Sequence, residues 1–155
     1  MRLLGIDYGE KRIGLAYADE LGLAVPIPPA AQADEPGRLA AIAREVERRR
    51  VETVVVGYPY NMDGSVGFKA REVDAFIERL GAVVSCALER QDERLTTHAA
   101  QRGLEATGRA GKRDRRVRAS GEVDSRAAAL ILQDYIDAHD LAPPSLLEPG
   151  EEDGW

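Results

Sequence analysis

The stretch MRLLGIDYGEKRIGLAYAD, residues 1–19, decides the fold. Residues 3–6 are aliphatic except for one glycine and predict a buried strand that ends at the carboxylate of Asp7. A short polar turn follows, and residues 12–17 again have the composition of a strand. Two strands joined by so short a turn form a β-hairpin. Asp7 is therefore either a turn residue that accepts bonds from backbone N–H groups, or a carboxylate suited to bind a metal ion or activate a nucleophile.

The rest of the chain alternates between strand-like and helix-like segments. The expected order is strand, helix, strand, helix, strand, helix, helix, at residues 23–27, 38–50, 53–59, 66–80, 82–88, 95–104 and 121–139. Pro28 and Pro29 are expected to end the first of these strands. The second is a β-branched run without alternation, which is typical of a strand buried on both faces in a parallel sheet. We expect an α/β fold with a mixed five-stranded sheet, an N-terminal hairpin, two β-α-β crossovers and helices on both faces.

Composition narrows the class of protein. The chain has 155 residues, a formal net charge of −6 and a single cysteine, Cys86, which excludes an internal disulfide framework and a cysteine-rich zinc site. We expect one domain over residues 1–140, followed by a flexible acidic tail at 141–155. The sequence shows neither a signal peptide nor an apolar run of membrane-spanning length, so we expect a cytoplasmic protein without a membrane partner, either monomeric or homodimeric.

A basic segment stands out in this acidic chain at residues 102–118. It holds seven Lys and Arg side chains against two acidic ones, and Arg113, Arg115 and Arg116 lie within it. Its glycines and its shortage of aliphatic side chains predict a mobile loop over residues 103–120. Such a loop can bind phosphates locally, although the chain as a whole is too acidic to bind polyanions in bulk.

Acidic residues occur where three of the predicted elements begin or end. Asp7 ends the first strand, Asp92 and Glu93 follow the last parallel strand, and Asp124 opens the final helix. Because ligands in open α/β sheets bind at the carboxyl ends of the strands, we expect Asp7, the loop at residues 61–65 and Asp92–Arg94 along one edge.

Each acid also has a simpler interpretation. Glu93 could pair with Arg90 or Arg94 at the surface, and Asp124 could be a first-turn residue favoured by the helix dipole. Taken together, however, clustered carboxylates repel one another unless protons or cations neutralise them. Mg²⁺ and Mn²⁺ prefer such oxygen ligands, and two ions about 4 Å apart stabilise the attacking and leaving oxygens of phosphodiester cleavage. A basic loop beside them would hold a nucleic-acid backbone.

Five short motifs occur in order along the chain. They are LGIDYG at residues 4–9, KRIGLA at 11–16, VVGYP with NMDG at 55–64, DERLTT at 92–97, and VD, AA and ILQ at 123–133. In this order they resemble the YqgF family, also called RuvX or the Holliday-junction-resolvase-like family, over residues 2–138. The resemblance implies a ribonuclease H-like fold and a metal-dependent nuclease domain at residues 1–140. Members of this family are described as nucleases that trim the 5′ end of precursor 16S rRNA, and the related resolvases cut four-way DNA junctions.

The resemblance also implies roles for individual residues. Asp7, Glu93 and Asp124 look like the catalytic acids that bind Mg²⁺ or Mn²⁺, and Asp92 is an undecided neighbour. The positions that look like substrate contacts or their supports are Lys11, Arg12, Asn61, Arg94 and Thr97. The chain departs from the family pattern at Glu10, where a small hydroxyl residue is usual, and at Tyr58, where a leucine is usual. The strand at residues 54–56 carries no acid, so Glu93 must supply one from another strand.

The function expected from these features is a metal-dependent endonuclease, acting on the 5′ end of precursor 16S rRNA in ribosome biogenesis. One alternative is a Holliday junction resolvase that acts on branched DNA, and a further one is a non-catalytic RNA-binding assembly factor. A nucleotide-binding kinase shares the hairpin opening, but it needs a second similar domain. Residues 9–14 also lack the Lys-Ser/Thr that follows the glycines of a Walker loop.

Overall fold

The computed structural model describes residues 1–93, 122–139 and 141, and at residues 122–124 it describes the helical backbone alone. Its elements are β1 (Leu3–Asp7), β2 (Ile13–Ala18), β3 (Val25–Ala30), α1 (Glu35–Arg49), β4 (Thr53–Tyr58), α2 (Phe68–Gly81), β5 (Ala87–Asp92) and α5 (Glu122–Ala138). The predicted helix at 95–104, the basic loop and the acidic tail beyond Leu141 lie outside the described residues. Within residues 1–93 and 122–139, no helix is both long and apolar enough to cross a membrane.

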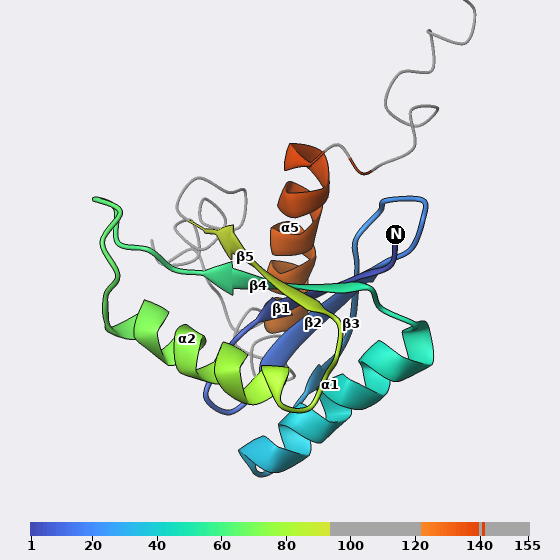
Figure 1. Cartoon of the computed structure of the whole chain (residues 1–155), viewed down its shortest axis with the longest axis horizontal. Helices are drawn as coiled ribbons and strands as arrows, with labels where there is room; N and C mark the ends of the chain where they lie inside the picture. The colour runs from blue at the N-terminus through green and yellow to red at the C-terminus, as the bar shows by residue number, and fades with distance from the viewer. Residues whose placement is uncertain (94–121, 140, 142–155) are drawn as a thin grey trace, which may run out of the picture.

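The five strands form one mixed sheet in the order β3-β2-β1-β4-β5 (Figure 1). β1 pairs with β2 and β2 with β3 in antiparallel fashion, while β1 pairs with β4 and β4 with β5 in parallel. The first nineteen residues thus form the predicted hairpin, and β1 joins the antiparallel half to the parallel half. The expected mixed five-stranded sheet is confirmed.

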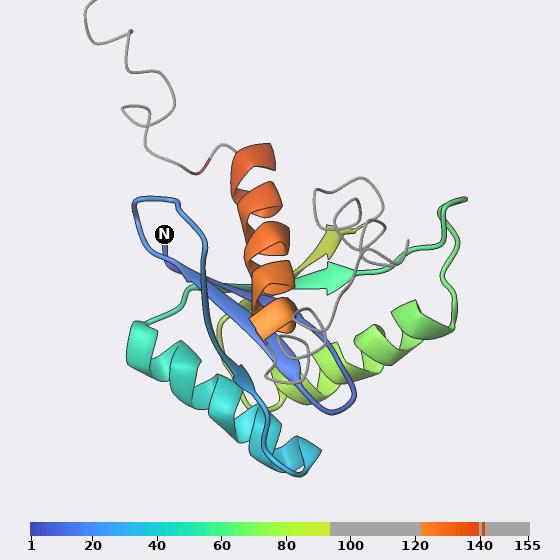
Figure 2. The ribbon, with the colours of Figure 1, turned by 180° about the vertical axis from the view of Figure 1, so that it is seen from behind.

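Helices cover both faces of this sheet. α1 and α2 lie on one face, and α5 crosses the other, as the view from behind shows (Figure 2). The two cores follow from strand alternation, because successive side chains point to opposite faces. Leu4 and Ile6 of β1 belong to the core under α1 and α2. Leu3 belongs to the core under α5, and Gly5 faces α5 as well.

α5 approaches β1 so closely at Gly5 that no larger residue fits there. A Cβ atom on Gly5 would lie 2.7 Å from Cβ of Leu132 and 2.8 Å from the carbonyl oxygen of Ala128. The second of these is a backbone atom, which cannot move aside without moving the helix. Gly5 therefore sets the depth at which α5 packs on the sheet.

Gly5→Ala is expected to destabilise the protein by about 1–3 kcal/mol, because it overpacks a rigid contact. Urea unfolding measures the change. Gly81→Ala is the matched control, since a Cβ there would meet only Cδ1 of Leu88, at 3.6 Å. Equal free energies of unfolding for the two variants would show that α5 can shift freely on β1.

Two strands differ from the expectation, and both lie at an edge of the sheet. β3 continues through Pro28 and Pro29, so the prediction that these prolines end it was wrong. Proline is tolerated in an edge strand because one side of such a strand has no ladder partner. The strand expected at residues 82–88 was also wrong, since β5 runs from Ala87 to Asp92. The backbone N–H groups of Val83 and Val84 instead bond to the carbonyl of Leu80, in a turn that ends α2.

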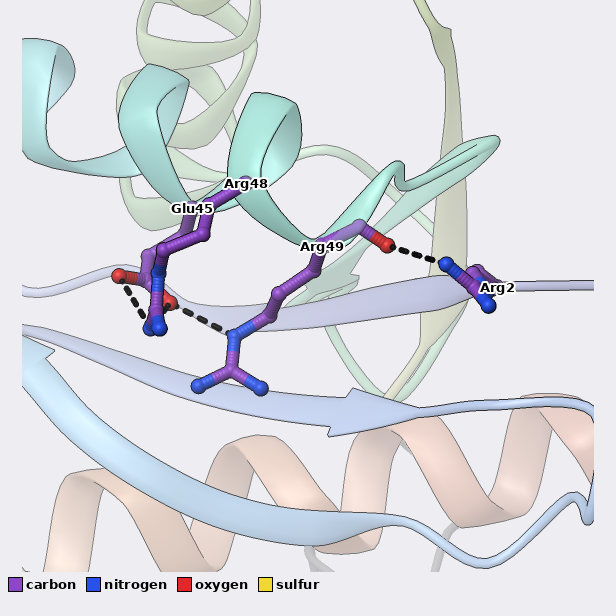
Figure 3. Close-up of polar contacts among 4 residues, drawn as sticks. All are labelled: Arg2, Glu45, Arg48 and Arg49. Atoms are coloured by element: carbon purple, nitrogen blue, oxygen red, sulfur yellow. Dashed lines mark hydrogen bonds and ion pairs between the residues drawn. The ribbon is translucent and has the colours of Figure 1, made fainter.

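Charged side chains close the edge of the sheet at which β1 and β4 begin (Figure 3). Glu45 of α1 accepts bonds from Arg49, with Nε···Oε1 2.7 Å, and from Arg48, with Nη2···Oε1 2.9 Å. The carbonyl of Arg49 accepts from Arg2, at 3.5 Å. Burial alone would raise the pKa of the Glu45 carboxyl, but the bonds from Arg49 and Arg48 outweigh it, and the net pKa is lowered.

Candidate active site

The carboxyl ends of the three parallel strands β1, β4 and β5 meet at one edge of the sheet. Ile6 of β1 pairs with Val56 of β4, so the residues that follow them, Asp7 and Gly57, lie side by side. The backbone N–H of Glu93, just beyond β5, donates to the carbonyl of the residue after Gly57, with N···O 3.1 Å. Strand pairing thus brings Asp7 and Glu93, far apart in the sequence, to the same edge.

The carboxylate of Glu93 lies over Gly57. The Glu93 residue is only 6% exposed, and a Cβ atom on Gly57 would lie 2.5 Å from its Oε1 and 2.6 Å from Cδ1 of Ile131. β4 supplies no acid of its own, and its glycine leaves the space that the acid from β5 occupies. The surface pairing of Glu93 with Arg90 is not observed, since Arg90 bonds to Asp74.

Strand alternation separates the two acids at the end of β5. Glu89 faces α5, where its Oε1 accepts from the hydroxyl of Tyr135 at 3.1 Å. Arg90 faces α2, and Asp92 follows it on that same face. Asp7 follows Gly5 on the α5 face of β1, which is also the face of Glu93. Asp7 and Glu93 therefore share one side of the edge, and Asp92 lies on the other.

α5 begins at this acidic edge and runs away from it. Near its start, Ser125 bonds to Leu15, which pairs with Ile6 one residue before Asp7. Further along, Gln133 bonds to the backbone N–H of Ala24, which lies beyond the far end of β2. Asp124 directly precedes Ser125 in the helix, so its backbone lies at the edge that carries Asp7 and Glu93.

The donor set at this edge fits a hard divalent cation. Two carboxylates, Asp7 and Glu93, lie on one face, and the helix that carries Asp124 starts on that face. Oxygen donors of this kind are the ligands that Mg²⁺ and Mn²⁺ prefer. Among the side chains that the structure describes, no three acidic, histidine or cysteine groups are close enough to hold a metal. The side chain of Asp124, the third predicted acid, is not among them.

Tyr58 fixes the end of β4 to α2. Its hydroxyl donates to Oδ2 of Asp74 at 2.6 Å, and the guanidinium of Arg90 donates to Oδ1 of Asp74 at 2.8 Å. Burial, reinforced by the bond to Asp74, raises the pKa of Tyr58 to about 12. The bond from Tyr58 in turn lowers the pKa of Asp74. Tyr58, which stands where a leucine is usual in the family, is thus a neutral, buried hydrogen-bond donor. Its bond to Asp74 holds the backbone next to Gly57 against α2.

A cavity of about 230 Å³ opens beside Glu93. Its lining comes from the β1–β2 turn, the end of β4, the first turns of α2 and the residue just beyond β5. It consists of Tyr8, Gly9, Glu10, Gly57, Pro59, Lys69, Glu72, Val73 and Glu93. Glu10, the unusual residue of the turn, is exposed on this rim. Among the described residues, Lys69 is the one cation of the lining, and it was not predicted from the sequence. The signal that could have found it is its place in the first turn of the helix that follows the loop at residues 61–65.

Arg38 of α1 bonds to the β1–β2 turn. Its role was also not predicted from the sequence. It is 8% exposed. Its Nη2 donates to the carbonyl of Glu10 at 2.9 Å, and its Nη1 donates to the carbonyl of Gln32 at 2.8 Å. In the sequence, a charged residue at this position is typical of the exposed face of an amphipathic helix. In the structure it ties the turn between Asp7 and β2 to α1.

The predicted substrate contacts have mixed outcomes. Lys11 and Arg12 lie in the turn beside Asp7, the first exposed and the second half-buried. Asn61 is exposed but closes its own loop, since its Nδ2 donates to Oγ of Ser65 at 2.9 Å and its backbone N–H donates to the Ser65 carbonyl at 2.9 Å. The remaining predicted contacts lie outside the described residues: Arg94, Thr97, Arg113, Arg115 and Arg116.

A mixed sheet in this order, with a helix crossing one face and acids at the ends of its central and edge strands, is a ribonuclease H-like fold. The solved structure of Thermus thermophilus RuvC has this fold, with a TM-score of 0.51 at 17% identity over 92% of this chain and 98% of that one. The same protein in complex with a Holliday junction substrate gives 0.52 at 15% identity, over 90% and 96%.

Residues 1–138 match the family model described as RuvX, Holliday junction resolvase, and the chain belongs to this family. One relative, from Opitutus terrae, is 47% identical over 152 residues, which cover 97% of this chain and all of the relative. That relative bears the name "Putative pre-16S rRNA nuclease". The resemblance stated from the five motifs is confirmed, and the chain is an enzyme of the nuclease class.

Proposed function

We propose that this protein is a metal-dependent endonuclease that hydrolyses phosphodiester bonds at the 5′ end of precursor 16S rRNA. The observation that carries the proposal is the edge at which Asp7 and the buried Glu93 share one face with the start of α5. The name of the Opitutus terrae relative supports precursor 16S rRNA as the substrate.

Asp7, Glu93 and Asp124 would hold Mg²⁺ or Mn²⁺. When bound, such an ion polarises the scissile phosphate and lowers the pKa of water. The chain's own contribution is to hold the acids in place before the substrate arrives. The Glu93 residue is buried and its Oε1 lies against Gly57, so little conformational entropy remains to be lost when its carboxylate is used.

Cations around the edge would orient the substrate. Lys11 and Arg12 in the β1–β2 turn and Lys69 on the cavity rim would face a phosphate backbone. These charges would bind RNA and DNA alike, because both present the same phosphodiester. The preference for RNA is therefore supported by the relatives and not by the geometry. The cytoplasm, as the site of ribosome assembly in a bacterial cell, is the location that this function predicts.

Purified protein with Mn²⁺ is expected to cut a precursor 16S rRNA fragment at its 5′ side, and excess EDTA is expected to abolish the cut. The control substrate is the same fragment without its precursor extension, which should remain intact. A four-way DNA junction is tested in parallel at the same ionic strength, since phosphate contacts make binding depend on salt.

Cleavage of the junction with the rRNA left intact would contradict the proposal and favour a resolvase. Binding of the rRNA fragment without cleavage in Mn²⁺ would favour a non-catalytic assembly factor. Gel analysis of end-labelled substrates distinguishes these outcomes in one experiment.

A further inference from the structure

The hydroxyl of Ser125 lies between two strands of the sheet. It donates to the carbonyl of Ile27 in β3, with Oγ···O 2.7 Å, and accepts from the backbone N–H of Leu15 in β2, with N···Oγ 3.4 Å. Leu15 and Ile27 face each other in the β2–β3 pairing. One serine on α5 thus bridges the backbones of two neighbouring strands.

The bridge occurs where the β2–β3 ladder is irregular. Ile13 pairs with Ala30 and Leu15 with Ile27, so the register shifts between these two pairs. A shift of this kind disrupts the ladder locally and leaves backbone groups in need of other partners. Ser125 is only 3% exposed, and unpaired backbone groups at that depth are costly. The hydroxyl meets this need as both donor and acceptor, which alanine at the same position could not do.

The two bonds also fix the start of α5. A residue in an α-helix is related to the next by a rise of about 1.5 Å and a rotation of about 100°, so the position of Ser125 determines that of Asp124 directly before it. We propose that Ser125 is a positioning residue, which sets the depth and rotation at which Asp124 enters the acidic edge. The proposal rests on the proposed function, since it takes Asp124 as an acid that binds the metal.

The same helix offers a matched control at its middle. Gln133 accepts from the N–H of Ala24 with Oε1, at 2.9 Å, and donates to the carbonyl of Gly22 with Nε2, at 3.1 Å. It too ties α5 to backbone groups through one donated and one accepted bond. It lies about two helical turns further along α5 than Ser125, on the same face of the sheet but beyond the far end of β2. Loss of either side chain removes two bonds to backbone groups, and Gln133 also donates to Oδ1 of Asp137 at 3.1 Å. Only Ser125, however, adjoins an acid of the proposed metal site.

The test compares Ser125→Ala with Gln133→Ala. Binding of Mn²⁺ is measured directly, from the free-ion signal in electron paramagnetic resonance, and stability is measured by thermal unfolding without metal. Ser125→Ala is expected to weaken Mn²⁺ binding about tenfold, in the range found when groups that orient metal ligands are lost. Gln133→Ala is expected to lower the melting temperature without a change in Mn²⁺ binding. Ser125→Cys, which keeps a weak donor, is expected to fall between wild type and Ser125→Ala.

Equal Mn²⁺ binding by Ser125→Ala and Gln133→Ala would overturn the positioning role. If Ser125→Ala does not fold, the same comparison is made with Ser125→Cys and decides in the same way. Asp124→Asn separates this inference from the proposed function on which it rests. Unchanged Mn²⁺ binding in that variant would remove Asp124 from the metal site, whereas a loss there with none in the Ser125 variants would leave the site intact and refute the role of Ser125 alone.

Discussion

Asp7→Asn is expected to reduce cleavage about a thousandfold while the protein remains folded. An ion that polarises the phosphate contributes several kcal/mol to the transition state, and each ~1.4 kcal/mol is a factor of ten in rate. The amide has nearly the shape of the carboxylate but lacks its charge, so it binds the ion weakly. Asp7 is half-buried at the end of β1, where an amide is also tolerated.

The metal-free stability of this variant gives a second and opposite expectation. Asp7 and Glu93 lie on one face at the same edge, and like charges repel when no cation lies between them. Asp7→Asn should therefore unfold at the same or a higher temperature than wild type in EDTA, and should gain less stability when Mn²⁺ is added, because an ion that binds only the folded state raises its stability. Lower stability in EDTA together with retained cleavage would refute both the site and its electrostatics.

Asp19→Asn is the matched control for this experiment. It makes the same change of charge in the turn after β2, where Oδ1 of Asp19 accepts from the N–H of Leu21 at 2.9 Å. Asparagine accepts an equivalent bond in such turns. Cleavage by Asp19→Asn should equal that of wild type, which excludes net charge as the cause of the loss at Asp7.

Gly57→Ala is expected to lower cleavage at least about a hundredfold, through a methyl group that carries no chemistry. The new Cβ would overlap Oε1 of Glu93 and Cδ1 of Ile131, so the carboxylate must move, and a displacement of about 1 Å in an active site can cost that much. Overpacking is also expected to cost about 1–3 kcal/mol of stability. Glu93→Gln should lose activity without the loss of stability, since it changes charge and leaves the volume nearly unchanged.

A double variant separates the two effects of Gly57→Ala. Ile131→Val removes Cδ1, one of the two atoms that the new Cβ would strike, and alone costs about 0.5–1.5 kcal/mol. Combined with Gly57→Ala, it should restore part of the lost stability and none of the cleavage, because Glu93 is still displaced. Recovery of both together would mean that Gly57 acts through the packing of α5 and not through Glu93.

The parts of the fold that the sequence predicted are those in which local pattern and tertiary environment agree. The hairpin has two apolar strands and a polar turn, and β4 is a β-branched run buried on both faces. β5 could not be found in this way because it is an edge strand. Its residues are polar and partly exposed, so the apolar run just before it, which ends α2, gave the stronger strand signal.

The site was predicted in part, for a related reason. The acids were found because they follow strands or open a helix and belong to motifs. Gly57 and Ser125 carry no such signal, since a glycine in a strand and a serine in a helix have many simpler interpretations. Their roles depend on what the fold places opposite them, Glu93 in one case and the β2–β3 ladder in the other. Arg38 was missed because its burial reverses the usual meaning of a charge on an amphipathic helix.

The crossing of α5 over the first strands has a consequence for the order of synthesis. The N-terminal strands leave the ribosome first, and until residues 122–138 follow, the apolar face formed by Leu3, Ala16 and Val55 has no cover. The acids Asp7 and Glu93 are then present without the helix that brings Asp124. On the proposed function, a growing chain would carry an incomplete site, so the ribosome that makes this nuclease would not meet it in active form before α5 has emerged.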